Sequence, residues 1–145
     1  MNILVVNGPN LNLIGKREPE IYGSLTYDDL LNHINNYAKN HNHTIEIYQS
    51  NSEGEIIDIL QNEYSKHDAI IINPAAYTHY SYAIYDCLKA IDIIKVEVHL
   101  TDIYKREAFR SVSVTKTACD KQFYGKGFES YIEAIKFIEE RGRIT

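Results

Sequence analysis

Apolar and polar residues follow two patterns along the chain: short apolar runs, and longer segments of helical periodicity. Apolar runs of four to eight residues, rich in β-branched side chains, predict buried or half-buried strands. Such runs occupy residues 3–6, 69–72 and 93–100, whereas residues 44–48 alternate apolar and polar side chains and predict a more exposed strand. A fifth strand is expected near residues 118–124, where Asp120, Lys121 and Gln122 interrupt the apolar pattern.

Between these runs lie segments with apolar residues at i, i+3 and i+4, the spacing of an amphipathic helix. They cover residues 26–40, a stretch beginning at residue 52, residues 80–90 and residues 128–140. Ser52-Glu53-Gly54-Glu55 matches the S-x-x-E capping box that begins many helices. Alternating strands and helices predict an α/β fold, a three-layer sandwich around a parallel sheet. Five strands favour the flavodoxin-like order 2-1-3-4-5.

Length and composition fit one domain. The chain has 145 residues, of which 44% are hydrophobic and 24% charged, close to an average globular domain. No linker or repeat divides it, so residues 1–145 are expected to form a single flavodoxin-like domain. The segment after the first strand, residues 8–25, is too long for a plain connector. Its part from about 15 to 25 is expected to act as a lid.

Charge and hydropathy argue against several classes of partner. The formal net charge is −5 and no basic run is present, so nucleic acid is not an expected partner. No apolar run approaches the ~18 residues of a membrane span, and no leader pattern opens the chain, so a cytoplasmic protein is expected. Cys87 and Cys119 lie far apart without C-x-x-C spacing, which argues against a disulfide scaffold or a zinc site.

Polar residues follow three of the predicted strands at the ends where open parallel sheets bind ligands. Asn7 ends the first strand, Asn73 the third and His99 the fourth. Strands 1, 3 and 4 are neighbours in the expected order, so these side chains should converge on one crevice. Ordinary loop polarity is the alternative interpretation.

Several common kinds of site are absent from the sequence. It contains no phosphate-binding G-x-x-x-x-G-K-[ST], no dinucleotide G-x-G-x-x-G and no G-x-S-x-G nucleophile motif. The strand ends offer mainly asparagine rather than the clustered histidines and acids of a metal site. What remains is a set of His, Tyr, Arg and Asn side chains, which suits acid–base chemistry with no cofactor and no metal.

Six segments resemble the type II 3-dehydroquinate dehydratases. In chain order they are residues 7–13 (NGPNLNL), 17–23 (REPEIYG), 49–55 (QSNSEGE), 73–79 (NPAAYTH), 97–100 (EVHL) and 106–110 (REAFR). The resemblance spans nearly the whole chain. It implies a hydro-lyase of the shikimate pathway, in aromatic amino acid and chorismate biosynthesis, that converts 3-dehydroquinate to 3-dehydroshikimate by anti elimination through an enolate. It also implies no cofactor and a homo-oligomer, a dodecamer built of trimers.

The resemblance assigns the acid–base roles. Tyr22 is the expected general base and His99 the expected general acid, with Asn12 stabilising the enolate oxygen. A phenol has a pKa near ~10, and lowering it by about two units requires roughly 2.7 kcal/mol of differential interaction. A nearby cation favours the phenolate, and Arg17 stands five residues before Tyr22. Glu97, two residues before His99, should share its face of the strand and orient the imidazole.

Further residues match substrate-binding positions of the family. The resemblance implies that the substrate carboxylate binds at Leu100 and Thr101 and that other groups bind Asn73, His79 and Arg110. It implies that Asp86 reaches the site of a neighbouring subunit. The remaining histidines stand in polar stretches and are expected to face solvent: His33, His41, His43 and His67.

Three positions depart from the family pattern. Thr101 replaces a usual serine and keeps the hydroxyl, Val112 replaces a usual histidine, and Asp102 replaces a usual asparagine. Asp102 would place a negative charge beside the carboxylate site. Two alternatives stay open: a non-catalytic flavodoxin-like binding module, such as a receiver or a flavin carrier, and a lyase that acts on a related cyclic hydroxy acid.

Overall fold

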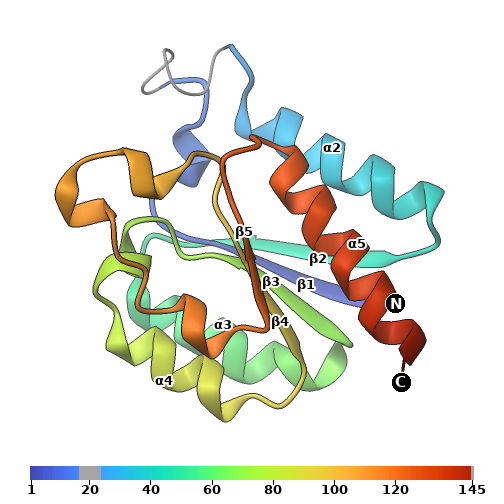
Figure 1. The fold of residues 1–145 in the computed structure, drawn as a ribbon. Coiled ribbons are helices and arrows are strands. Elements are labelled where there is room, and N and C mark those ends of the chain that lie inside the picture. The colour runs from blue at the N-terminus through green and yellow to red at the C-terminus, as the bar shows by residue number, and fades with distance from the viewer. Residues whose placement is uncertain (17–23, 145) are drawn as a thin grey trace.

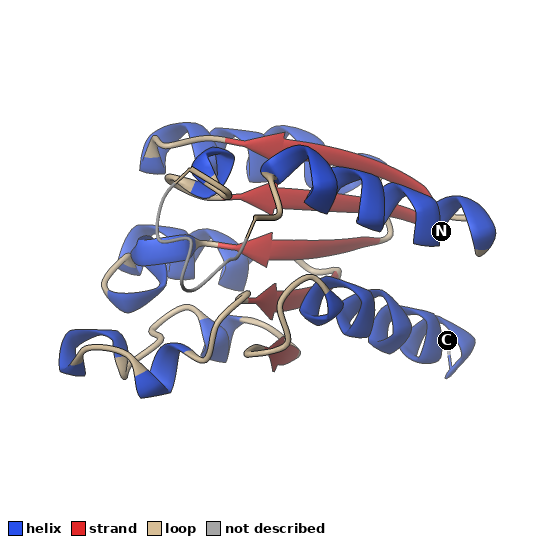
Figure 2. Cartoon of the chain, turned by 90° about the horizontal axis from the view of Figure 1, so that it is seen from above, coloured by secondary structure: helices blue, strands red, loops and turns tan. Residues whose placement is uncertain are grey.

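A five-stranded parallel sheet forms the centre of the structure, a computed structural model that describes residues 1–16 and 24–144 (Figure 1). Within these residues the strands are β1 (Asn2–Asn7), β2 (Thr44–Gln49), β3 (Ala69–Asn73), β4 (Ile94–Val98) and β5 (Lys121–Phe123). Every neighbouring pair is parallel, and the order is β2-β1-β3-β4-β5. All the arrows in Figure 2 accordingly point the same way. The predicted fold class and strand order are confirmed.

Helices cover both faces of the sheet. They are α2 (Tyr27–Asn40), α3 (Glu53–Glu63), α4 (Tyr82–Ala90) and α5 (Glu129–Ile144). Figure 1 shows α2 and α5 on one face and α3 and α4 on the other. No helix of the described chain is both long and apolar enough to cross a membrane.

Each face of the sheet has its own hydrophobic core. On β1, Ile3 and Val5 pack in the core beneath α2 and α5, whereas Leu4 and Val6 pack in the core beneath α3 and α4. All four side chains are fully buried. A strand buried on both faces requires apolar residues at every position, which is why β1 and β3 appear in the sequence as continuous apolar runs.

Side-chain caps fix where the helices begin. At α2, Thr26 Oγ1 accepts from the backbone N–H of Asp29, and the Asp29 carboxylate accepts from the N–H of Thr26. At α3, Ser52 Oγ accepts from the N–H of Glu55, as the capping-box pattern predicted. Because such bonds satisfy N–H groups that have no partner within the helix, they set each first turn.

The predicted boundaries differ from the structure mainly near β5. That strand has only three residues, and the preceding Lys116–Ala118 form a short 3-10 helix, η6. Asp120 terminates the pairing with β4, since its carboxylate accepts from the N–H of Lys95 at 2.8 Å. Helix α4 begins at Tyr82, two residues later than expected, because Ser81 is its N-cap.

Candidate active site

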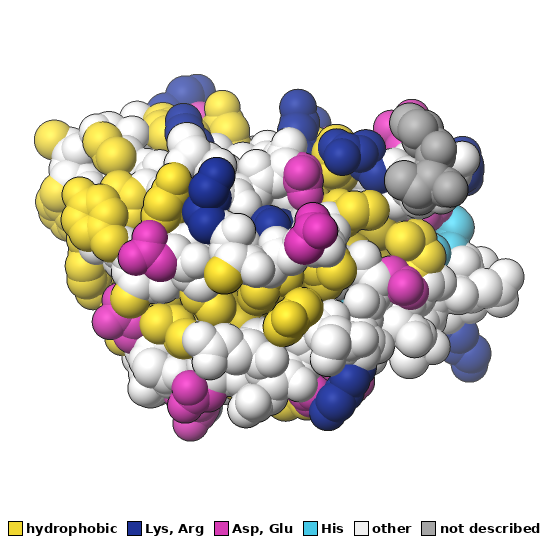
Figure 3. All heavy atoms as spheres, turned by 90° about the horizontal axis from the view of Figure 1, so that it is seen from below, with side chains coloured by type: hydrophobic (Ala, Val, Ile, Leu, Met, Phe, Trp, Pro, Cys, Tyr) yellow, Lys and Arg dark blue, Asp and Glu magenta, His cyan; other side chains and the backbone are white. Residues whose placement is uncertain are grey.

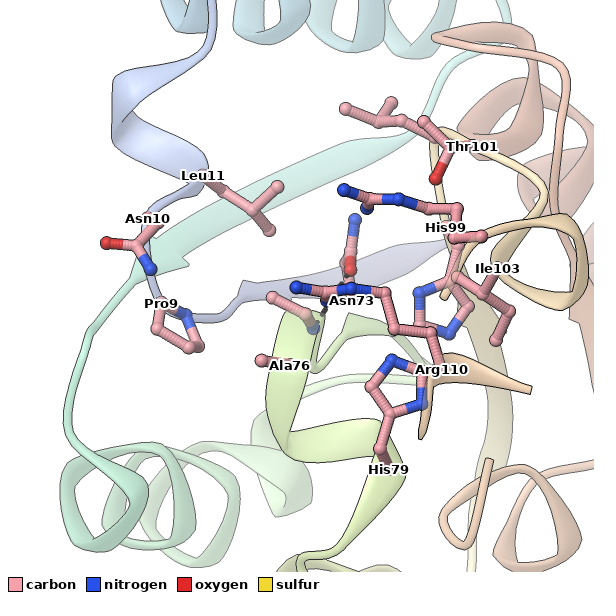
Figure 4. A pocket seen from close by; sticks show the side chains of 13 residues that line it. Pro9, Asn10, Leu11, Asn73, Ala76, His79, His99, Thr101, Ile103 and Arg110 are labelled. Carbon is pink, nitrogen blue, oxygen red and sulfur yellow. Dashed lines mark hydrogen bonds between the residues drawn. The ribbon is translucent and has the colours of Figure 1, made fainter. Parts of the chain in front are cut away.

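A cavity lies beyond the carboxyl ends of β1, β3 and β4, where the sequence placed the crevice. It has a volume of about 580 Å³, part of it open to solvent. Its walls come from the loops after these three strands, which include the short 3-10 helices η1 (Leu11–Leu13), η3 (Ala75–His79), η4 (Ile103–Lys105) and η5 (Ala108–Arg110). The lining residues are Pro9, Asn10, Leu11, Asn73, Ala75, Ala76, His79, His99, Leu100, Thr101, Ile103, Arg106 and Arg110 (Figure 4).

A buried acid–imidazole pair lies at the end of β4. His99 Nε2 is 2.9 Å from Glu97 Oε2, and the two side chains are 4% and 0% exposed. Burial alone would raise the pKa of Glu97. Its hydrogen bond to His99, the charge of His99, and the hydroxyls of Thr115 and Ser113 outweigh burial and hold the pKa below the ordinary value. The expected contact between Glu97 and His99 is therefore present.

A buried hydrogen-bond chain anchors the floor of the cavity. Asn73 Nδ2 donates to Tyr131 Oη at 3.0 Å, and Tyr131 Oη donates to Asn7 Oδ1 at 2.6 Å. Asn7 Nδ2 then donates to Tyr27 Oη at 3.2 Å. Asn7 and Asn73 are register partners on β1 and β3, so both side chains project toward α2 and α5. The amide of Asn73 is thus fixed from the interior while the residue lines the cavity.

The loops after β1 and β3 approach each other closely at Gly8. Its N–H donates to Asn73 O at 2.8 Å, and a Cβ atom at Gly8 would lie 2.6 Å from Pro74 O. No side chain fits there, since the obstructing atoms belong to the backbone. Ala75, the next residue of the β3 loop, has φ +52°, a left-handed conformation that non-glycine residues adopt at a cost.

Basic side chains face the cavity from the loops after β3 and β4. Figure 4 shows His79, His99 and Arg110 close together on one side of the cavity, across from Leu11. Arg110 Nε donates to Glu107 at 2.7 Å, and Arg106 also lines the cavity. Among the described residues that line the cavity, two are arginines and none is Asp or Glu, and this lining suits an anionic ligand although the chain has a net charge of −5.

The hydrogen bond of His79 to a backbone carbonyl fixes the position of its ring proton, and its surroundings favour the neutral form. Its Nδ1 lies 2.6 Å from Val112 O, a carbonyl that can only accept, so Nδ1 carries the proton. Burial lowers the pKa of His79. The charges of His99 and Arg110 lower it further, against the opposing effects of the Val112 carbonyl and Glu97. Its Nε2 is therefore the acceptor nitrogen.

Six of the predicted site residues line the cavity together: Asn73, His79, His99, Leu100, Thr101 and Arg110. Asn12 and Asp86 are exposed and do not line it. Arg17 and Tyr22 lie outside the described residues, as does most of the predicted lid.

Two further cavity residues, Asn10 and Arg106, received no binding role from the sequence. Both belong to segments that carried the resemblance, so their position beside Asn12 and Arg110 was the available signal.

The carboxylate of Asp102 is engaged by residues of its own loop. Its Oδ1 accepts from the N–H of Tyr104 at 3.0 Å and caps η4, and its Oδ2 lies 4.0 Å from Lys105 Nζ. Asp102 is not a lining residue of the cavity. In the described chain, no group of three or more His, Cys, Asp or Glu residues is arranged to hold a metal ion.

Comparisons with known proteins agree with this geometry. A sequence model described as dehydroquinase class II matches residues 1–139. The chain is 53% identical over 140 residues to the 3-dehydroquinate dehydratase of Clostridium beijerinckii, covering 96% of each protein. It is 52% identical over 139 residues to that of Caldicellulosiruptor bescii, covering 95% of this chain and 96% of the other.

Solved structures give the same result. The type II dehydroquinase from Butyrivibrio crossotus superposes with a TM-score of 0.93 at 51% identity, covering 96% of this chain and 97% of that one. The enzyme from Propionibacterium acnes superposes with a TM-score of 0.90 at 36% identity, covering 94% of both. The resemblance seen in the sequence motifs is confirmed, and the chain belongs to the class II dehydroquinase family.

Proposed function

We propose that this protein dehydrates 3-dehydroquinate to 3-dehydroshikimate, as a hydro-lyase of the shikimate pathway. The observation that carries the proposal is the buried Glu97–His99 pair, placed at a cavity that Arg106 and Arg110 also line. The arginines and hydrogen-bonding groups of such a site suit a small anionic cyclic ketone. Family membership and the names of the relatives, 3-dehydroquinate dehydratases, support the same reaction.

The proposed reaction is an anti elimination in two proton transfers. Tyr22, as phenolate, removes a proton from the carbon next to the ketone, and the electron pair of that C–H bond forms the enolate. The enolate then collapses and expels the hydroxyl from the adjacent carbon, while His99 protonates it so that it leaves as water. Tyr22 acts as general base with help from Arg17, whose charge favours the phenolate.

The remaining groups bind and orient the substrate. Leu100 and Thr101, at the end of β4, would bind the carboxylate through backbone N–H groups and the threonine hydroxyl. The other polar groups of the substrate would bind the side chains of Asn73, His79 and Arg110, which line the same cavity.

Asn12 is proposed to stabilise the enolate oxygen, directly or through a water molecule. Asn10 lines the cavity two residues earlier and provides the matched comparison. If Asn10→Ala lowers kcat and Asn12→Ala does not, the enolate role belongs to Asn10.

We also propose a homododecamer built of trimers in which Asp86 of one subunit approaches the site of the next. Asp86 is exposed on α4, and several large apolar side chains near it or near the cavity are exposed as well: Tyr80 (59%), Tyr82 (70%), Phe109 (67%) and Val112 (56%). Figure 3 shows hydrophobic side chains gathered toward one end of the face it presents. Light scattering tests the assembly, and Asp86→Ala should lower activity if the acid acts across the interface. A cytoplasmic location is proposed with this pathway.

The direct test is to add purified protein to 3-dehydroquinate and follow the conjugated enone of the product by ultraviolet absorbance. Absorbance should rise with the wild type and not with Tyr22→Phe or His99→Asn, while Tyr124→Phe remains active. A Tyr22→Phe variant with wild-type activity would remove Tyr22 from the mechanism. Borohydride should not inactivate the enzyme, since no imine forms. If 3-dehydroquinate is inert and a related cyclic hydroxy acid in a substrate panel is dehydrated, the substrate assignment is wrong.

A further inference from the structure

The carboxylate of Glu97 is surrounded by side-chain donors from other segments of the chain. It is fully buried, so water does not solvate its charge. Besides His99, its Oε2 accepts from Thr78 Oγ1 at 3.0 Å, Ser113 Oγ at 2.8 Å and Gln122 Nε2 at 2.6 Å, and its Oε1 accepts from Thr115 Oγ1. We call Thr78, Ser113 and Thr115 the hydroxyl clamp.

The three hydroxyls of the clamp also contact one another. Thr78 Oγ1 lies 2.7 Å from both Ser113 Oγ and Thr115 Oγ1. All three residues are buried, with exposed fractions of 0%, 5% and 0%. Burying a hydroxyl group is costly unless it has a hydrogen-bond partner, so valine or alanine would be the less costly residue at a buried position that served only for packing. Here every hydroxyl reaches the same carboxylate.

The clamp connects the segments that carry the site. Thr78 precedes His79 on η3, and Ser113 and Thr115 follow Arg110 by a few residues. Backbone contacts hold these segments together independently of the clamp, since Val114 N donates to Thr78 O at 2.7 Å. Removing a clamp hydroxyl should therefore change the surroundings of Glu97 and leave the chain path intact.

An ionised carboxylate can only accept hydrogen bonds, so the ionisation state of Glu97 determines whether Nε2 of His99 carries a proton. With Glu97 ionised, His99 Nε2 must carry the proton of their 2.9 Å hydrogen bond. Nδ1 is then the nitrogen left for the substrate. If Glu97 were neutral it could donate to Nε2 instead, and the positive charge on the imidazole would lose its counter-ion. Hydrogen-bond donors around a carboxylate favour its ionised form, and bonds to a charged group are stronger than bonds between neutral groups. The clamp hydroxyls therefore favour ionised Glu97.

We propose that Thr78, Ser113 and Thr115 are positioning residues of the dehydration: they keep Glu97 charged and oriented, so that His99 can hold the proton it delivers to the leaving hydroxyl. They act through Glu97 and do not touch the substrate. This inference rests on the proposed function of His99 as general acid.

The kinetic test compares variants that differ in one hydroxyl. Thr115→Val keeps the shape and removes the donor, Thr115→Ser keeps the donor, and Thr117→Val makes the same change at an exposed threonine. We expect Thr115→Val to lower kcat at least tenfold with KM within threefold. Thr115→Ser should stay within threefold of wild type, and Thr117→Val should match it. A merely structural role predicts lower thermal stability with kcat unchanged, and that result would overturn the proposal.

The second readout is the titration of His99, measured by NMR of ring-labelled histidine and assigned with His99→Asn. Apart from Glu97, the titratable or charged groups that line the cavity with His99 are His79, Arg106 and Arg110, and Cys119 lies near Glu97. Removing a clamp donor favours the neutral form of Glu97, so a smaller fraction of Glu97 is ionised beside His99. The titration midpoint of His99 should therefore move to lower pH. The alkaline limb of the kcat profile should move with it.

The two proposals fail in different ways. If wild-type protein leaves 3-dehydroquinate unchanged, the proposed function fails, and the His99 titration still tests the clamp. If the wild type is active and Ser113→Ala/Thr115→Val shows wild-type kcat and an unshifted His99 midpoint, the clamp proposal is wrong. Should that double variant not fold, the isosteric Thr115→Val alone decides.

Discussion

Replacing Tyr131 with phenylalanine deletes one buried oxygen from the floor of the cavity. The ring of Tyr131 is fully buried in the core between the sheet and α5, so the phenyl group keeps its packing. The lost hydroxyl accepts from Asn73 Nδ2 at 3.0 Å and donates to Asn7 Oδ1 at 2.6 Å. The variant therefore tests hydrogen bonding without making a cavity of side-chain size.

The expected cost follows from these two bonds. Each buried hydrogen bond contributes about 1 kcal/mol net, and an unsatisfied buried partner costs about 1–3 kcal/mol. Two polar groups lose a partner here, so Tyr131→Phe should lower the free energy of unfolding by roughly 2–6 kcal/mol. At about 4 °C per kcal/mol for a domain near 150 residues, Tm should fall by roughly 8–24 °C.

The measurement is urea unfolding at fixed protomer concentration, because subunit assembly would otherwise change the apparent stability. Tyr124→Phe, at a position 40% exposed, is the matched control and should change stability by less than about 0.5 kcal/mol. A loss under about 0.5 kcal/mol in Tyr131→Phe would refute the buried chain as a stabilising element. Asn73 should also become less well ordered, which raises KM for the substrate.

Three more predictions concern stability. Thr26→Ala removes the capping box of α2 and should cost about 1 kcal/mol in urea unfolding, whereas Thr26→Ser should not. Ile71→Ala leaves a cavity at a fully buried position on β3 and should lower the free energy of unfolding by about 2–5 kcal/mol. A smaller loss would mean that neighbouring side chains relax to fill the cavity. His79 has a pKa below about 6.5 when folded, so the unfolded chain takes up its proton first as pH falls. Stability should be full above pH 6.5 and decline below it, and His79→Asn should make that decline shallower.

The sequence predicts strands well where burial is complete. Every residue of β3 is buried, and its apolar run matches the observed strand to within one residue. β5 was harder to define because it is a three-residue edge strand whose first residue, Lys121, is exposed. The start of α4 depends on Ser81, whose hydroxyl donates to Glu53 on α3. The pattern of apolar residues does not reveal a contact between side chains 28 positions apart, so it did not predict this helix start.

The same distinction applies to the site. Glu97 and His99 were recognisable as a pair because two residues along a strand share one face. The hydroxyl clamp was not, since its members meet only when the loops after β3 and β4 fold together. His43 and His67 were wrongly expected to face solvent. The side chain of His43 is only 8% exposed, with Nε2 3.5 Å from Glu139. His67 is buried, with Nδ1 2.7 Å from Glu63 O and Nε2 3.0 Å from Glu46 on β2.

The close approach at Gly8 fixes the spacing of the two loops that form one side of the cavity. With backbone atoms of Pro74 only 2.6 Å from where a methyl group would begin, the loops after β1 and β3 can neither move closer nor accept a larger residue between them. Homologues or engineered variants that take a bulkier ring must gain their room elsewhere, from the η4 and η5 segments across the cavity. Changes in substrate range should therefore come from substitutions around Ile103 and Arg110, while the loops after β1 and β3 stay unchanged.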